Sequence, residues 1–224
     1  MKIFTIIKED SKRIPNKNFV DVNGHPLWWH LLSELDGLDV TVNTDSQKFI
    51  KQLQESNLKS VRVIKRHQKH IDWENDKTID SSPVEDMLFD FCETLDKSEI
   101  VVLTHITSPF LKKQTIFDAV DILKNDQNSK SIHSVHKIKD FVWVKKENET
   151  SPVNFQIDRV QQTQDLAPIF VSKGAFFIAK AEDILDQRKR LPEPLIFFSL
   201  DHVQSVEIDN FEDLDFAKLL KGKL

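Results

Sequence analysis

The sequence predicts a three-layer α/β fold in which helices cover both faces of a mostly parallel β-sheet. Short apolar runs alternate with amphipathic segments at residues 3–7, 27–35, 40–42, 49–58, 61–64, 84–95, 100–103 and 116–123. Parallel strands need such helical crossovers, so this order favours a parallel sheet. Residues 131–178 instead hold short β-rich pieces (SIHSV, FVWV, VNFQI, FFIA), which indicate an inserted hairpin arm.

Local signals support the individual helices. Ser82, Pro83 and Glu85 have the spacing of a capping box with proline at the first helical position, so a helix is expected from there. Pro26 begins the 27–35 helix in the same way, and residues 205–224 predict a last strand followed by an amphipathic helix. We expect one domain over residues 1–224, with an inserted arm at about 133–170.

Composition excludes several classes of protein. The 31 Lys and Arg against 36 Asp and Glu give a net charge of −5, so no general basic field attracts nucleic acid or an anionic membrane. Cys92 is the single cysteine, and the amino-terminal residues predict neither a secretory leader nor a membrane span, which favours the cytoplasm. With 4 glycines, the chain has neither G-x-G-x-x-G nor a Walker A loop. Side chains must therefore hold the phosphates of any bound nucleotide.

The loops after the predicted strands are the expected ligand site, because ligands of such sheets lie at the carboxyl ends of the strands. These loops follow Ile7, Asn43, Ile64 and Leu103. The first of them, residues 8–18, carries four cations and two anions in a chain of net negative charge. Such a loop could neutralise a triphosphate and stabilise a leaving pyrophosphate, but a solvated surface loop would look the same.

Motifs along nearly the whole chain resemble one family. They are SKRIPNKN at 11–18, NGHPL at 23–27, TDS at 44–46, TSP at 107–109, QTQDL at 162–166, GAFFI at 174–178 and EID at 207–209. Arg66 and Asp80 also stand where that family has an Arg and an Asp. In this order, the motifs resemble the acylneuraminate cytidylyltransferases, which make CMP-activated sialic acids. The resemblance implies a Rossmann-like nucleotidyltransferase fold with a β-rich dimerisation arm.

The reaction implied by the resemblance is attack of the sugar's anomeric hydroxyl on the α-phosphorus of CTP, with Mg²⁺ organising the phosphates. Lys12 would stabilise charge in the transition state, with Lys8 and Lys17 as further catalytic cations. Asn18, Arg66 and the segment around Asp80 would recognise cytosine and ribose. The nucleotide-binding residues implied are Lys8, Ser11, Lys12, Arg13, Asn18, Asp45, Arg66, Asp80 and Ser82.

Four candidate site residues keep alternative interpretations. Asp45 could orient the loop lysines or the ribose, or it could cap the next helix. Arg66 could be one more member of a basic run. Glu207 and Asp209 alternate along a predicted strand, so both carboxylates would face one side as Mg²⁺ ligands. Asp209 and Glu212 also have the spacing of a capping box, with Glu207 then simply exposed.

Departures from the family pattern concentrate in its acceptor half. Gln162 and Lys173 replace the family's Arg and Asn, whereas the metal half changes conservatively, with Glu207 for the first Asp of D-I-D. This implies an acidic nonulosonic acceptor other than N-acetylneuraminate, with Arg159 and Lys173 as candidates for its carboxylate. The acceptor-binding residues implied are His105, Thr107, Arg159, Gln161, Gln164 and Lys173.

Two other functions stay open: a nucleotidyltransferase acting on a non-sugar acid or phosphonate, and a nucleotide-binding protein without turnover. Glu9 and Asp10, two anions beside the expected triphosphate, motivate the second. The pairs at 67/70 and 133/136 have the spacing of zinc ligands, but neither pair has a nearby Cys or a further ligand, so zinc is not expected. The expected partners are CTP, an acidic sugar and a second copy of the chain.

Overall fold

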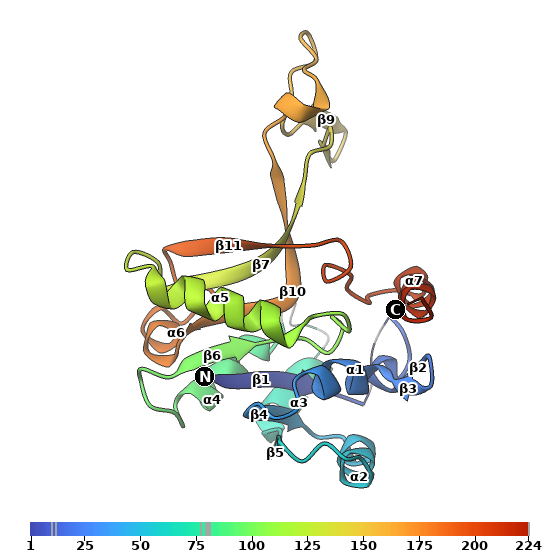
Figure 1. The fold of residues 1–224 in the computed structure, drawn as a ribbon, viewed down its shortest axis with the longest axis vertical. Helices are drawn as coiled ribbons and strands as arrows, with labels where there is room; N and C mark the ends of the chain where they lie inside the picture. The colour runs from blue at the N-terminus through green and yellow to red at the C-terminus, as the bar shows by residue number, and fades with distance from the viewer. Residues whose placement is uncertain (10, 12, 77, 79–81, 224) are drawn as a thin grey trace.

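A seven-stranded mixed sheet, ordered β11-β7-β10-β6-β1-β4-β5, forms the centre of the protein (Figure 1). The computed structural model describes residues 1–9, 11, 13–76, 78 and 82–223. Four strands are parallel neighbours: β5 (Val61–Lys65), β4 (Val40–Thr44), β1 (Lys2–Ile7) and β6 (Ile100–Leu103). Next to them, β10 (Ile169–Lys180) is antiparallel to β6 and to β7 (Ser131–Ile138), and β11 (Leu195–Leu200) is parallel to β7.

Helices cover both faces of this sheet and bury two apolar clusters. On one face, α1 (Leu27–Glu34), α2 (Gln47–Glu55) and α5 (Lys113–Asn125) enclose the larger cluster. On the other face, α4 (Val84–Cys92) and α6 (Ala181–Gln187) pack on the smaller cluster, where Phe4 and Phe91 stack with ring centroids 4.7 Å apart. The predicted three-layer α/β class is therefore confirmed.

The remaining elements lie at the edges of the sheet. They are η1 (Lys17–Phe19), β2 (Asp21–Val22), β3 (His25–Pro26), α3 (Gln68–Asn75) and α7 (Phe211–Lys221). The basic run that contains Arg66 thus ends in a helix that the apolar pattern did not reveal, because α3 buries only His70. None of the described helices combines the length and the apolar character needed to cross a membrane.

Residues 139–168, which we call the arm, project from the sheet beyond β7 and β10 (Figure 1). A hairpin of β8 (Trp143–Lys146) and β9 (Glu149–Pro152) lies in the arm, followed by η2 (Thr163–Asp165). Phe155 packs edge-on against Phe141 and Trp143, with ring centroids 5.1 and 5.0 Å away. The strand predicted at 153–157 is wrong, since these residues follow β9 as irregular structure. Dimerisation through the arm stays a prediction.

Two predicted capping boxes are wrong. Helix α4 begins at Val84 with Pro83 as its N-cap, so Ser82 does not cap it. Helix α7 has its capping box one residue later than predicted, at Asn210 and Asp213. The strand predicted before α7 is also wrong, because residues 206–209 form no strand and belong to none of the described sheets. These shifts leave the side chains of Ser82 and Asp209 available for other contacts.

Candidate active site

A cavity of about 350 Å³ lies at the carboxyl ends of β1 and β6, where the fold class places ligand sites. Its lining comes mainly from the loop after β1, the start of α4, the loop after β6 and the segment before α7. The predicted site residues that line it are Lys8, Ser11, Arg13, Lys17, Asn18, Ser82, His105, Thr107, Glu207 and Asp209. Lys12 and Asp80 lie outside the described residues.

A second cavity of about 310 Å³ adjoins the first, with Lys8, Ser11 and Glu74 lining both. It adds the predicted residues Asp45 and Arg66. Together the two cavities bring the candidate nucleotide-binding residues of three strand ends to one place, as parallel strands require.

Lys17 and Arg13 gather around a single carboxylate. The nearly buried Lys17 Nζ donates to the carbonyl oxygen of Ile208 at 2.8 Å and lies 3.2 Å from Asp209 Oδ1. Arg13 donates to the same oxygen at 2.6 Å. Asn16, in the left-handed region at φ 53°, lets the loop turn into η1, which carries Lys17. The loop after β1 is thus fastened to the segment before α7.

Arg66 ties the ends of three elements together from a buried position. Its Nη1 donates to Glu74 Oε2 at 2.7 Å and lies 3.4 Å from Asp45 Oδ1, while Nη2 donates to the carbonyl of Ile7 at 3.2 Å. Lys8 Nζ lies 3.3 Å from the other oxygen of Glu74. Glu74 therefore holds both cations, and sequence reasoning missed it because α3 gives no amphipathic signal. The guanidinium of Arg66 has protein partners, and its predicted contact with cytosine stays a prediction.

The start of α2 settles the alternative interpretation of Asp45. Ser46 is the N-cap, accepting from the Phe49 amide at 3.1 Å, so the expectation that Asp45 could cap this helix is wrong. Ser46 also donates to Glu9 Oε2 at 2.9 Å, which holds that carboxylate toward α2. One of the two anions that made turnover questionable is therefore tied by a hydrogen bond of its own.

Glu207 and His105 lie close against the backbone at Gly174, so a side chain there would have to displace them. The Gly174 amide donates to Glu207 Oε2 at 3.3 Å, and a Cβ at 174 would overlap Oε1 of Glu207 and lie 2.5 Å from His105 Nδ1. Burial raises the pKa of Glu207, and the Gly174 amide opposes that rise. Burial also lowers the pKa of His105 to about 4, with a smaller effect of the Arg190 charge. The imidazole beside Glu207 is therefore neutral near pH 7.

The predicted acceptor-binding residues are divided. His105 and Thr107 line the first cavity, whereas Arg159, Gln161 and Gln164 are exposed on the arm. Lys173, in β10, acts electrostatically on Glu207 but lines neither cavity. The expectation that Arg159 and Lys173 face an acceptor within one chain is therefore not supported by their positions.

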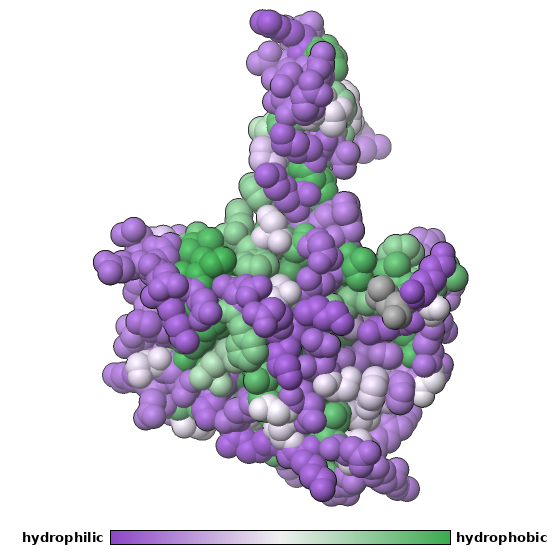
Figure 2. Space-filling view, viewed as in Figure 1, coloured by the Kyte–Doolittle hydropathy of each residue, from purple (hydrophilic) through white to green (hydrophobic). Residues whose placement is uncertain are grey.

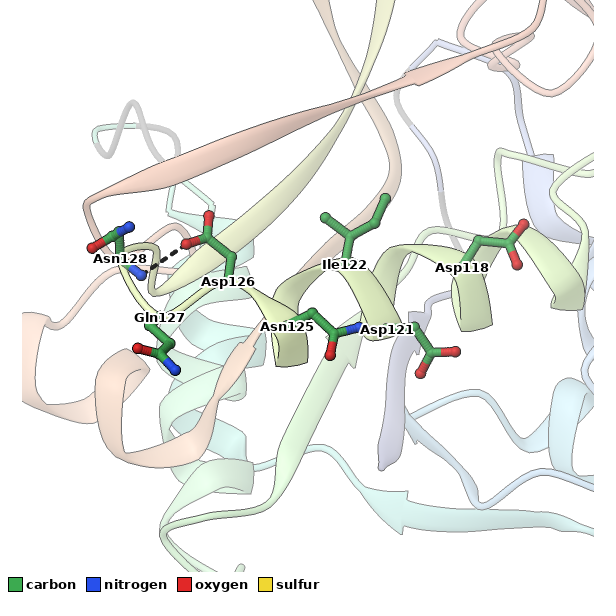
Figure 3. A pocket seen from close by; sticks show the side chains of 7 residues that line it. All are labelled: Asp118, Asp121, Ile122, Asn125, Asp126, Gln127 and Asn128. Atoms are coloured by element: carbon green, nitrogen blue, oxygen red, sulfur yellow. Dashed lines mark hydrogen bonds between the residues drawn. The ribbon is translucent and has the colours of Figure 1, made fainter.

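A third hollow does not fit a triphosphate, and the histidine pair at 133 and 136 does not have the arrangement of a metal site. The hollow of Figure 3 follows the outer side of α5 toward its carboxyl end and carries Asp118, Asp121 and Asp126 without a cation in its described lining. In this pair, His133 Nε2 lies 2.6 Å from Ser172 Oγ, whereas the ring centroid of His136 lies 4.6 Å from that of His202. The side chains of that pair thus have separate partners.

Comparisons with known proteins identify the family of the chain. A family model described as cytidylyltransferase matches residues 8–223. An N-acylneuraminate cytidylyltransferase of Streptococcus agalactiae serotype V is 25% identical over 95% of this chain and 52% of its own length. The chain thus spans about half the length of this curated relative. A CMP-N,N'-diacetyllegionaminic acid synthase of Legionella pneumophila is 29% identical over 93% of this chain and 91% of its own length.

Solved structures show the same fold at low sequence identity. A CMP:2-keto-3-deoxy-manno-octonic acid synthetase complexed with CTP superposes with a TM-score of 0.68 at 15% identity, covering 99% of this chain and 98% of that one. A 4-diphosphocytidyl-2C-methyl-D-erythritol synthase from Anaerococcus prevotii has a TM-score of 0.66 at 15% identity, covering 99% and 96%. Since the family model spans residues 8–223 and these structures share the fold, this chain belongs to the cytidylyltransferase family.

Proposed function

We propose that the protein transfers CMP from CTP to an acidic, sialic-acid-like sugar and releases pyrophosphate. The observation that carries the proposal is the meeting of Lys8, Arg13 and Lys17 with Glu207 and Asp209 in one cavity. Family membership supports the cytidylyl half of the reaction. Relatives named for N-acylneuraminate and diacetyllegionaminic acid support the acidic sugar.

The cations of the cavity have carboxylate partners that a nucleotide can replace. Lys8 contacts Glu74, while Arg13 and Lys17 share Asp209. A triphosphate would offer these cations phosphate oxygens instead, at the end of the sheet where they are already positioned. Positioning and electrostatics of this kind are the main contributions that proteins make to nucleotidyl transfer. Lys12 stays our sequence-based candidate for the cation that stabilises the transition state.

The two carboxylates fit a divalent cation. Glu207 and Asp209 line the same cavity and are hard oxygen ligands of the kind that Mg²⁺ prefers. Burial raises the pKa of Glu207, as expected for a carboxyl group without a nearby cation strong enough to offset its desolvation. Bound there, Mg²⁺ would neutralise charge on the phosphates and on the leaving pyrophosphate.

The chemistry proposed is a displacement at the α-phosphorus. The anomeric oxygen of the acceptor forms a bond to the α-phosphorus, the bond from that phosphorus to the α,β-bridging oxygen breaks, and the hydroxyl hydrogen is lost as a proton. His105 and Thr107, on the loop after β6, line the first cavity but not the second and would contact acceptor hydroxyls. Since His105 is neutral near pH 7, its role is hydrogen bonding rather than charge.

The arm is the part of the protein that we propose to form a homodimer. Its exposed apolar side chains are Phe141, Trp143, Val153, Ile157 and Val160. Figure 2 shows a few apolar residues among hydrophilic ones on one face of the arm. Arg159, Gln161 and Gln164 belong to the same surface, so dimerisation is the way in which they would approach an acceptor. A mass of one chain at micromolar concentration would contradict this. We keep the cytoplasm as the expected location, where CTP is available and Cys92 stays reduced.

The test is pyrophosphate release from CTP, with ATP, GTP and UTP as controls, with and without Mg²⁺, across N-acetylneuraminate, diacetyllegionaminic, pseudaminic and 2-keto-3-deoxy-octonic acids. Release should require CTP, Mg²⁺ and one of these acids. Lys17→Met should abolish it, whereas Lys51→Met, on the exposed side of α2, should not. Release that occurs only with a non-sugar acid would show that the acceptor is not a sugar. CTP that neither reacts nor raises the melting temperature would overturn the proposal.

A further inference from the structure

A buried histidine and two carboxylates meet between α3 and α4, outside both cavities. His70 Nε2 lies 3.0 Å from Asp86 Oδ2 and 3.5 Å from Asp90 Oδ2. The His70 side chain is 1% exposed, whereas Asp86 and Asp90 are partly exposed. One ligand atom from each residue lies within 4.8 Å of the other two. A buried nitrogen thus faces two carboxylates that solvent can reach.

The spacing of these atoms is that of metal ligands. Ligands about 2.1 Å from a metal are roughly 3.0 Å apart at a right angle and roughly 3.4 Å apart in a tetrahedron. The two distances from His70 are close to these values. Asp86 and Asp90 are four residues apart on α4, so both point from the same helix face toward α3. Each helix therefore supplies its part of the cluster without backbone rearrangement.

The ammonium group of Lys69 contacts both carboxylates of the cluster. Lys69 Nζ lies 3.0 Å from both Asp86 Oδ2 and Asp90 Oδ2. Its side chain is 46% exposed, so it can leave for solvent at low cost. Its hydrogen bond to Asp86 is also the main reason that the pKa of this carboxyl group is lowered, which keeps it ionised. The arrangement shows that the pocket between the carboxylates already accepts a positive group.

The two ring nitrogens of His70 differ in their partners. His70 Nδ1 is buried and has no hydrogen-bond partner among the described residues. Because the ionised Asp86 carboxylate only accepts, Nε2 carries the ring proton in this arrangement. Metal binding at Nε2 would release that proton or move it to Nδ1, which no hydrogen bond with a described residue holds. His67 does not compete for this place, because its Nδ1 accepts from the Lys69 amide at the start of α3.

We propose that His70, Asp86 and Asp90 bind a transition-metal ion of the Zn²⁺ type, with water completing its coordination and Lys69 displaced. One imidazole nitrogen with two carboxylate oxygens suits Zn²⁺, Mn²⁺ or Co²⁺ better than Mg²⁺, which prefers oxygen ligands alone. Sequence spacing cannot reveal the site, because the carboxylates follow His70 by 16 and 20 residues and only the packing of α3 on α4 joins them.

The site would fasten α4 to the helix that organises the loop after β1. Helix α3 also carries Glu74, which binds Lys8 and Arg66. A metal between α3 and α4 would therefore stabilise the wall of the second cavity as well as the fold. This effect does not depend on the acceptor or on turnover, so the proposed function can fail while the metal site stands.

The test is titration of the chelator-treated protein with Zn²⁺, followed by calorimetry and by melting temperature, and with Co²⁺, followed by visible absorption. One equivalent should bind with micromolar affinity and raise the melting temperature. Asp90→Asn, at a partly exposed side chain, should lower the affinity at least tenfold, and Lys69→Met should raise it several-fold. Glu207→Gln should leave this binding unchanged, which separates it from the proposed Mg²⁺ position.

The matched control is His67→Gln, a neighbouring exposed imidazole that should bind metal as the parent chain does. His70→Gln should bind as poorly as Asp90→Asn, and its melting temperature without metal reports whether the fold survives. Equal Zn²⁺ affinity in the parent and Asp90→Asn proteins would overturn the proposal. So would the absence of any binding, or a tenfold excess of Mg²⁺ displacing Co²⁺ from the site.

Discussion

The cavity and the arm hold candidate site residues in opposite states. In the cavity, Lys8, Arg13 and Lys17 each have a carboxylate partner before any ligand binds. On the arm, Arg159 is exposed and has no ion pair with a described residue. The cavity is thus organised by one chain, whereas the arm presents groups that need another surface. Substitutions in the cavity should impair the reaction itself, and those on the arm should impair only acceptor use.

The largest effect is expected at Gly174, which lies close to the side chains of Glu207 and His105. Gly174→Ala should lower kcat/KM by more than about a hundredfold, because its Cβ would displace Glu207 and His105. Steady-state pyrophosphate release measures this. Gly222→Ala is the matched control, since its Cβ meets Asn23 Nδ2 at 3.2 Å at the end of α7, far from the cavity, and activity should stay within twofold. Near-equal activities of the two variants would contradict the crowding described at Gly174.

The second effect concerns acid stability. The pKa of His105 is about 4 in the folded protein, below its ordinary value of 6.5, so the unfolded chain takes up a proton first as the pH falls. His105 should therefore destabilise the fold between pH 6.5 and 4, by about 2–3 kcal/mol at the lower end. Urea unfolding at pH 7 and pH 4.5 measures the loss, which should be smaller in His105→Gln. His202→Gln, at an exposed side chain, should lose as much stability as the parent.

These tests also bear on what the sequence could predict. The parallel order of the first strands and the positions of Lys8, Lys17 and Asn18 follow from alternation and from loops at strand ends, which are local signals. Glu74 was missed because α3 has one buried residue and so little periodicity. The capping alternative at Asp209 was off by one residue because Asn210 and Asp213 satisfy the same pattern, and only the backbone path selects between them. The arm residues were recognised as motifs, but their distance from the cavity depends on tertiary structure.

A third effect separates the metal from the fold. Asp209→Asn should raise the Mg²⁺ concentration for half-maximal activity about tenfold, because a carboxylate that also orders Arg13 and Lys17 loses its charge. Its neighbour offers the reverse case, since Asn210→Ala removes the α7 cap and should cost about 1 kcal/mol of stability with an unchanged Mg²⁺ requirement. Mg²⁺ titration of activity and urea unfolding of both variants measure this. Equal shifts in both would mean that Asp209 acts only through the start of α7.

The smallest effect tests the arm. Arg159→Ala should raise the KM for the acidic acceptor about fivefold and leave the KM for CTP unchanged, because an exposed cation contributes about 1 kcal/mol to a carboxylate contact. Lys146→Ala, on the same arm but in β8, is the control and should change neither constant. The proposed dimer should persist in both variants, as measured by mass in solution. If Arg159→Ala alters the KM for CTP instead, the assignment of CTP binding to the cavity and of acceptor binding to the arm is wrong. If it alters only the acceptor constant, and does so only in the dimer, the arm completes a site that one chain leaves open.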